Sequence, residues 1–282
     1  MSLCKRIIPK LDIKGSNLVK GINLEGLRVM GNPEKFAEYY FNNGADELIY
    51  QDVVASLFGK NSLKEIIKKT AKSIFVPLTV GGGIRSIDDI KEVLESGADK
   101  VSLNTAVLKK PELISESANI FGSSTIVVGM EINHIDNNYF CFTDNGRNNS
   151  NIKVLDWITQ VQESGAGEII LTFVNRDGTF KGPDLEFLKK LNKLIKIPTI
   201  IHGGFGNLEH FKDVFNHSFV SGVCVASLFH NHIIKNNKIN FMPNDMGNLQ
   251  YIQKKEGKDN LNSLEIKFLK DYLIKHNIKC RS

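Results

Sequence analysis

The stretch VPLTVGGGIR, residues 76–85, is a segment suited to a β-strand that runs into three consecutive glycines and then into a helical pattern. Glycine lets a backbone approach a ligand closely and adopt positive φ. When a strand ends in glycines and a helix follows, free backbone N–H groups point at one place, which favours a bound phosphate. Alone, a run of three glycines is more often a tight turn, so further evidence is needed.

That evidence is a repeat, because IPTIIHGGFG at residues 197–206 has the same pattern at an offset of 121 positions. GADELI at 44–49 returns as GAGEII at 165–170 with the same offset. SLNTAVL at 102–108 aligns more weakly with VCVASLF at 223–229, again at this offset. One offset held over three motifs indicates a duplicated structure.

Strand-like and helical patterns alternate along the whole chain. The expected strands are 6–12, 47–53, 76–80, 99–104, 125–131, 168–174, 198–202 and 222–226. The expected helices are 32–43, 61–73, 86–96, 111–120, 152–164, 184–195, 207–216 and 262–276. This order predicts a single (β/α)8 barrel over residues 1–282, built of two (β/α)4 half-repeats. Two doubly wound domains are the alternative, but the loops are short and no linker separates the halves. Residues 231–261 form an Asn- and Lys-rich insertion before the last helix.

Composition excludes several classes of function. The 282 residues are 41% hydrophobic, enough for a full core, and no apolar run approaches the roughly 20 residues of a membrane span. The net charge of +5 comes from scattered lysines, so neither nucleic acid nor a membrane is an expected partner. Scattered cysteines and no cleavage-site pattern predict a reduced, cytoplasmic protein. We expect no metal, because His230-x-His232 is better explained as a solvated loop.

In a (β/α)8 barrel the chemistry lies at the carboxyl ends of the strands. Two carboxylates, Asp12 and Glu131, end the first strand of each half and should face each other across this mouth. Paired carboxylates of this kind act as acid and base, although helix caps or ion pairs are equally good explanations. The two glycine loops also lie opposite each other, which predicts a ligand with a phosphate at each end. Other residues expected at the mouth are Asp52, Asn104, Thr105, Thr172, His202, Ala226 and Ser227; simple helix capping also explains Thr105 and Ser227.

Charged residues mark the opposite end of the barrel. Two cations and two carboxylates lie at strand starts: Arg6 begins strand one, Glu47 strand two, Lys100 strand four and Glu168 strand six. Burying such groups costs free energy unless they are paired. We therefore expect a ring of ion pairs, which is either a stabilising collar or a gate.

At these motifs the chain resembles the cyclase subunit of imidazole glycerol phosphate synthase. The resemblance covers residues 1–230. It is carried by KRIIPKLDIKG (5–15), LVKGIN (18–23), GADELIYQDVVAS (44–56), FVPLTVGGGIRS (75–86), GADKVSLNTAVL (97–108), GAGEIILTFVNRDGT (165–179) and GNLEHF (206–211). The isomerase of the preceding histidine step is the next most similar family, but LVKGIN is the cyclase form.

The resemblance implies a carbon–nitrogen lyase that needs no cofactor. Ammonia from a glutaminase subunit, docked at the N-terminal face near Asp99, passes the ring and reacts with a ribulosyl formimino aminoimidazole carboxamide ribotide. The products are imidazole glycerol phosphate and the aminoimidazole carboxamide ribotide. Asp12 is the implied general base, Glu131 the general acid, and Lys20 a substrate contact. The implied phosphate-binding residues are Gly81, Gly82, Gly83, Asn104, Thr105, Asp177, Gly178, Thr179, Gly203, Gly204, Ala226 and Ser227.

The chain departs from this family's pattern at its reaction centre. Glu131 stands where the family has aspartate, and Lys10 and His202 replace small residues. Residues 6, 8, 10 and 12 share one face of a strand, so Lys10 should lie inside the barrel and pair with Asp12 or Glu131. These changes resemble a paralogous branch that conducts ammonia to a sugar amidotransferase in surface glycan biosynthesis. An unrelated bisphosphate sugar isomerase is the third interpretation.

Overall fold

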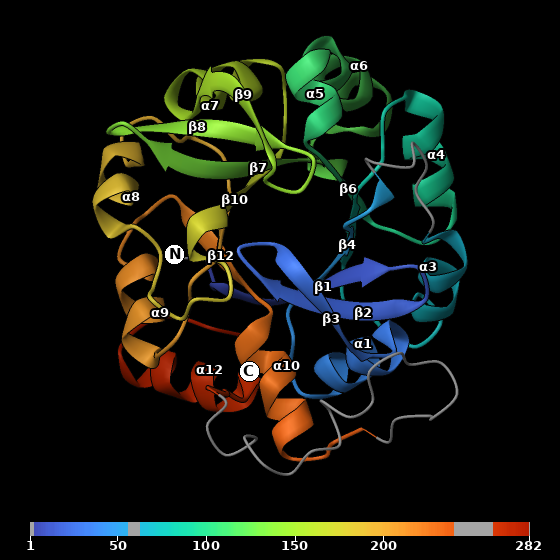
Figure 1. Cartoon of the computed structure of the whole chain (residues 1–282), viewed down its shortest axis with the longest axis vertical. Helices are drawn as coiled ribbons and strands as arrows, with labels where there is room; N and C mark the ends of the chain where they lie inside the picture. The colour runs from blue at the N-terminus through green and yellow to red at the C-terminus, as the bar shows by residue number, and fades with distance from the viewer. Residues whose placement is uncertain (1–2, 56–62, 240–261, 282) are drawn as a thin grey trace.

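The computed structural model describes residues 3–55, 63–239 and 262–281. Within these residues, eight parallel strands pair in the order β10-β11-β12-β1-β4-β5-β6-β7, and pairing of β7 with β10 closes the sheet into a barrel (Figure 1). The predicted (β/α)8 barrel is confirmed. Its strands are β1 (Arg6–Lys14), β4 (Leu48–Asp52), β5 (Leu78–Gly81), β6 (Lys100–Leu103), β7 (Ile126–Ile135), β10 (Glu168–Phe173), β11 (Thr199–His202) and β12 (Val220–Val225).

The helices surround the barrel, as Figure 1 shows. Their starts follow local sequence: Asn32 caps the helix that begins at Pro33, and Ser86 with Asp89 forms a capping box. The helices are α1 (Pro33–Asn42), α3 (Lys64–Thr70), α4 (Ile87–Glu95), α5 (Thr105–Lys109), α6 (Glu112–Phe121), α7 (Val154–Glu163), α8 (Leu185–Leu191), α9 (Leu208–Phe215), α10 (Ser227–Lys235) and α12 (Ile266–Lys275).

The 231–261 segment is only partly described. Its first five residues, 231–235, belong to α10, a helix that the sequence pattern did not predict. Residues 240–261 lie outside the described residues. The last helix, expected at 262–276, is α12. No helix among the described residues is both long enough and apolar enough to cross a membrane.

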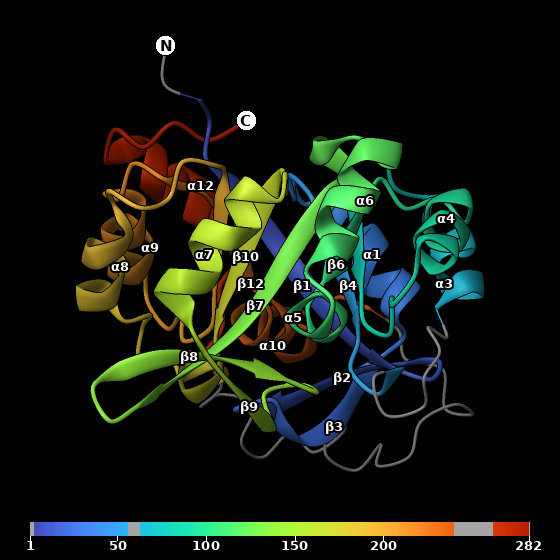
Figure 2. The same cartoon turned by 90° about the horizontal axis from the view of Figure 1, so that it is seen from above.

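Two antiparallel hairpins were also not predicted. β1 continues beyond Asp12 and pairs with β2 (Asn17–Ile22), which pairs with β3 (Glu25–Gly31). In the second half, β7 continues beyond Glu131 to β8 (Asn138–Thr143) and β9 (Asn148–Lys153). The two carboxylates therefore lie within long strands, and the expectation that they end their strands was wrong. Figure 2 shows both hairpins at the end of the barrel opposite the two termini.

Alternation along β1 separates two environments. Ile7, Leu11 and Ile13 belong to the large apolar cluster that the strands and the helices share. Ile8 belongs instead to a smaller cluster, in which each of six barrel strands contributes one residue: Ile8, Ile49, Val127, Ile170, Ile200 and Cys224. We call this cluster the inner apolar layer. It occupies the barrel interior between the strand starts and the mouth, because Arg6 precedes Ile8 on this face while Lys10 and Asp12 follow it.

Candidate active site

Asp12 is enclosed by ammonium groups. Its Oδ1 accepts a hydrogen bond from Lys10 Nζ at 2.5 Å, and its Oδ2 lies 3.7 Å from Lys20 Nζ. The side chain is buried, and burial alone would raise its pKa. The charges of Lys10 and Lys20 outweigh burial and lower the pKa of Asp12 to about 2. Of the two partners that the sequence left open for Lys10, the structure selects Asp12.

Lys20, on β2, connects this pair to a second buried carboxylate. Its Nζ forms an ion pair with Asp177 Oδ2. His202 Nε2 lies 3.4 Å from Asp177 Oδ1, while His202 Nδ1 contacts the carbonyl oxygen of Cys224 at 2.8 Å. Burial lowers the pKa of His202 to about 4, so the imidazole is neutral at neutral pH. Lys10, Asp12, Lys20, Asp177 and His202 thus form one buried network, which we call the Asp12 network.

Glu131 occupies a different environment. It lies on β7 beside Thr172 of β10, and its Oε2 accepts a hydrogen bond from the backbone N–H of Gly146 at 2.7 Å. Burial raises the pKa of Glu131 to about 7, although the Gly146 hydrogen bond and the charge of Lys10 act in the opposite direction. Two carboxyl groups at one mouth therefore differ widely in their affinity for a proton.

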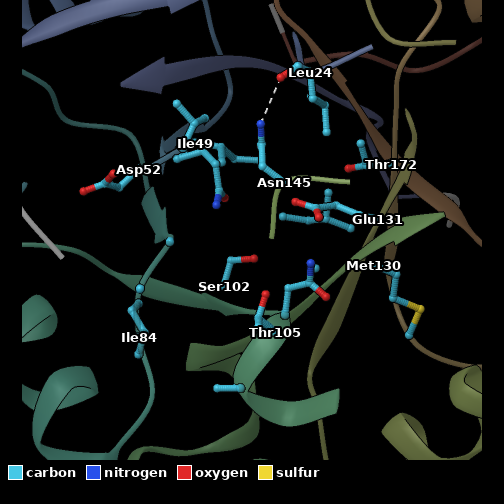
Figure 3. Close-up of a pocket in the computed structure, with 18 of the residues that line it drawn as sticks. Leu24, Ile49, Asp52, Ile84, Ser102, Thr105, Met130, Glu131, Asn145 and Thr172 are labelled. Carbon is cyan, nitrogen blue, oxygen red and sulfur yellow. Dashed lines mark hydrogen bonds between the residues drawn. The ribbon is translucent and has the colours of Figure 1, made fainter. Parts of the chain in front are cut away.

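A cavity opens beside Glu131 at the mouth (Figure 3). Figure 3 shows Glu131, Ser102 and Thr105 around the same space. Of the residues predicted for the first phosphate, Gly82, Gly83, Asn104 and Thr105 line this cavity, as does Lys10. Gly81, which ends β5, is not part of the lining. A Cβ atom at Gly81 would stand 2.5 Å from Gln51 Oε1.

A smaller cavity lies at the second glycine loop. The lining includes most residues predicted for the second phosphate, namely Asp177, Gly178, Gly203, Gly204, Ala226 and Ser227. His202 lies in the same wall. Thr179 is not part of the lining, and its hydroxyl donates to the carbonyl oxygen of Arg176 at 2.7 Å. Neither cavity has Asp12 or Lys20 in its lining.

The glycines of both loops are required by their conformation. Gly82 and Gly203 have φ of +96° and +100°, values that side-chain-bearing residues rarely adopt. A Cβ atom at Gly82 would stand 2.2 Å from the carbonyl oxygen of Asp52. The corresponding atom at Gly203 would stand 2.7 Å from the carbonyl oxygen of Phe173. The loop after β5 thus packs tightly against the end of β4, and the loop after β11 packs tightly against the end of β10.

The ion-pair ring expected at the opposite end is present. Arg6 pairs with Glu47 at 2.8 Å and also with Glu168. Lys100 pairs with both carboxylates at 3.0 Å. Glu47 Oε1 also accepts a hydrogen bond from Thr79, and Arg6 donates to Ser221 at 2.8 Å. These four charged side chains form a closed cycle, which we call the charged ring.

Asp99 lies close to the charged ring but makes a different kind of contact. It is exposed, and its Oδ2 accepts a hydrogen bond from the backbone N–H of Leu78 at 2.8 Å. It therefore lies at the strand-start end, where the resemblance implies a partner.

The sequence interpretation missed the turn that supports Glu131. Asp144, Asn145 and Gly146 connect β8 to β9, all with positive φ. Asn145 Nδ2 donates to the carbonyl oxygen of Leu24 at 3.0 Å, which joins the two hairpins over the cavity (Figure 3). The tripeptide Asp-Asn-Gly is a hairpin signal that was available in the sequence. Among the described residues, no group of three His, Cys, Asp or Glu side chains could hold a metal ion.

The fold and the site define a (β/α)8 barrel with a charged ring at one end and a two-carboxylate mouth at the other. The family described as "Histidine biosynthesis protein" matches residues 6–235. Imidazole glycerol phosphate synthase subunit HisF of Legionella pneumophila is 51% identical over 207 residues, which is 73% of this chain and 98% of that protein. The HisF subunits of Staphylococcus saprophyticus and Natranaerobius thermophilus are 45% and 42% identical over 228 residues, covering 80% and 81% of this chain and 90% and 91% of their own.

Each relative aligns over most of both chains, and the family match over residues 6–235 includes every residue of the charged ring and of the Asp12 network. The chain belongs to the family of imidazole glycerol phosphate synthase HisF subunits.

Proposed function

We propose that this chain is the cyclase subunit of an imidazole glycerol phosphate synthase in histidine biosynthesis. As a carbon–nitrogen lyase, it joins ammonia to the ribulosyl formimino aminoimidazole carboxamide ribotide. Imidazole glycerol phosphate and the aminoimidazole carboxamide ribotide are released. The observation that carries the proposal is the placement of Glu131 and the Asp12 network between two glycine-lined cavities, at the far end of the barrel from the charged ring.

The substrate carries a phosphate at each end, and the two cavities match this shape. Backbone N–H groups at Gly82 and Gly83 serve one phosphate, and those at Gly203 and Gly204 serve the other. Positive φ at all four glycines favours a loop whose N–H groups converge on an anion. Between these anchors, Glu131 is the carboxyl group that borders the larger cavity.

Ammonia enters at the opposite end, from a glutaminase subunit docked beside Asp99. It passes the charged ring and then the inner apolar layer, which favours neutral ammonia over ammonium because it offers no partner for a charge. The ring is the gate in this proposal, because Lys100 and Arg6 each bridge two carboxylates and close the strand-start end.

A turnover assay tests this proposal. The purified chain should convert the ribulosyl substrate when an ammonium salt is supplied, and glutamine should replace the salt only after a glutaminase subunit is added. Glu131→Gln should lower turnover by about 100-fold or more, the usual contribution of an acid–base group. The control is Glu95→Gln, on an exposed face of α4, which should match the parent chain. Absence of turnover at saturating substrate and ammonia would exclude cyclase activity.

The sugar-amidation interpretation also expects Lys10 to pair with a carboxylate at the mouth, as it does with Asp12. The relatives named above do not favour that branch over the cyclase. Poor binding of the ribulosyl substrate to the folded chain, together with no turnover, would favour the sugar-amidation interpretation.

A further inference from the structure

We propose that Lys10 is a positioning residue that holds Asp12 permanently ionised and thereby assigns proton transfer at the mouth to Glu131. The inference rests on the proposed function, since it concerns which carboxyl group serves the cyclase reaction. It departs from the division of roles in which Asp12 is the general base and Glu131 only the acid.

Asp12 lies between two ammonium groups and away from both cavities. Lys10 Nζ contacts one carboxylate oxygen at 2.5 Å, and Lys20 Nζ lies 3.7 Å from the other. The side chain of Asp12 is 2% exposed and lines neither cavity. Two buried ammonium groups stabilise the ionised form of this carboxylate, and neither cavity brings a ligand against it.

Glu131, in contrast, is accessible from the larger cavity. Its carboxyl group borders the larger cavity and is partly exposed. Oε2 accepts the hydrogen bond from Gly146, and among the described residues Oε1 has no protein partner. One oxygen is thus held in place while the other faces the space where a ligand would bind. This is the geometry expected of a group that exchanges a proton with its substrate.

Burial and the charged groups around Glu131 set its affinity for a proton. From β1, Lys10 lowers the pKa of Glu131 and Asp12 raises it; from the β8–β9 turn, Asp144 raises it. The neighbours from β10 and β6, Thr172 and Ser102, are uncharged. Together with burial these groups raise the pKa of Glu131 to about 7. A carboxyl group with this pKa carries a proton in part of the molecules at neutral pH and can both donate and accept one.

Lys10 is what separates the two carboxyl groups. Lys20 is shared with Asp177, so Lys10 is the closer counterion of Asp12. In the reaction, the ammonia nitrogen adds to the ribulosyl carbonyl carbon while Glu131 donates its proton to the carbonyl oxygen, and Glu131 recovers a proton from the added nitrogen, which gives a carbinolamine. Glu131 then donates a proton to the hydroxyl group, which leaves as water, and recovers a second proton from the nitrogen as the carbon–nitrogen double bond forms, so the carboxyl group ends in its starting state. Asp12 remains charged throughout and balances the two lysines.

Carbon-13 NMR of the carboxyl groups tests the assignment without requiring turnover. In the full chain, Glu131 should titrate near pH 7 and Asp12 should stay ionised above about pH 4. Lys10→Met should raise the Asp12 midpoint by more than about one pH unit, because the nearest counterion is lost. Lys10→Arg should restore the parent value. The control is Lys14→Met, on the same strand but exposed, which should move neither midpoint.

The cyclase assay gives the second readout. Because Glu131 acts first in its protonated form, kcat at fixed neutral ammonia should fall as pH rises through about 7. Lys10→Met should alter this profile, whereas Lys10→Arg should keep it. An Asp12 midpoint that ignores Lys10→Met, or a Glu131→Gln variant that keeps more than a tenth of the parent kcat, would overturn the proposal. A parent chain that titrates as expected but shows no turnover would refute the cyclase function instead.

Discussion

Two carboxyl groups at one barrel mouth have opposite surroundings. Asp12 is buried among ammonium groups, which lower its pKa to about 2, whereas burial raises the pKa of Glu131 to about 7. The difference follows from their neighbours: Asp12 contacts Lys10 directly, while the hydrogen bond to Glu131 comes from an uncharged backbone N–H. Of the two, Glu131 has the pKa near neutral pH that suits a group which both donates and accepts a proton.

The raised pKa of Glu131 predicts a pH-dependent stability. In the unfolded chain its pKa is near 4.5, so between pH 4.5 and about 7 the folded chain binds more protons than the unfolded one. This carboxyl group therefore lowers the free energy of unfolding as pH rises, by up to about 3 kcal/mol. Glu131→Gln should remove that loss. Denaturant titrations from about pH 5 to about pH 8 should show the variant gaining stability relative to the parent.

The control for this measurement is Glu95→Gln, since Glu95 is exposed on α4. Its stability difference from the parent should stay constant over the same pH range. A constant difference for Glu131→Gln as well would mean that Glu131 titrates at its ordinary pH in the folded chain.

At the scale of elements, short β-strands followed by glycine loops create the two cavities. β5 and β11 each have four residues, and each ends at a turn of two glycines with positive φ. The first strand of each half does the opposite and continues past the barrel into a hairpin. Asn145 joins the two hairpins through the carbonyl oxygen of Leu24. Short strands thus leave space for a ligand, and long ones cover it.

The first glycine loop should tolerate no side chain at Gly82. Gly82→Ala places Cβ 2.2 Å from the Asp52 carbonyl oxygen and retains an unfavourable φ of +96°. Gly44 is a matched control, with φ of +84° but no heavy atom within 4 Å. Urea denaturation should show a loss of about 1 kcal/mol for Gly44→Ala and roughly 3 kcal/mol or more for Gly82→Ala. Equal losses would show that the loop moves away from Asp52 at little cost.

At the scale of the whole molecule, the chain ends are joined to the barrel by a buried ion pair. Lys270 on α12 contacts Asp46 Oδ1 at 2.7 Å and the carbonyl oxygen of Arg281 at 2.9 Å. Asp46 Oδ2 in turn accepts the backbone N–H of Ile7 at 2.8 Å. Residues from the start, the first third and the end of the chain therefore meet at the strand-start end, near the charged ring.

Removal of one partner of this pair should destabilise the fold. Lys270→Met leaves the Asp46 carboxylate buried without its cation, which typically costs about 3 kcal/mol or more. The control is Lys267→Met, an exposed position on the same helix, which should change the free energy of unfolding by less than about 0.5 kcal/mol. Thermal or urea unfolding of both variants measures the difference. Similar values for the two would mean that Asp46 is compensated by the Ile7 N–H alone.

Sequence reasoning recovered the parts of this protein that repeat or follow a simple period. Runs of Val, Ile and Leu marked the eight barrel strands, and glycine pairs marked both loops. The period of two along β1 placed Lys10 beneath Asp12. The two hairpins were missed for different reasons. β9, NNSNIK, has the alternation of neither a buried strand nor a helix, whereas β8, NYFCFT, has a strand-like composition that was not used. α10 was missed because its residues, SLFHNHIIK, lead directly into the Asn-rich segment.

The sequence alone determined the barrel, its two glycine loops, the four residues of the charged ring and the presence of a lysine inside the first strand. These depend on local conformation and strand periodicity, which neighbouring residues dictate. The tertiary structure decided that Lys10 pairs with Asp12 and not with Glu131, and that Gly146 supports Glu131. The first of these contacts lies within β1, and the second lies between β7 and the turn that joins β8 to β9. The choice of Lys10 between Asp12 and Glu131 depends instead on distances across the closed barrel between β1 and β7, which are far apart in the sequence, and on the burial that the barrel imposes.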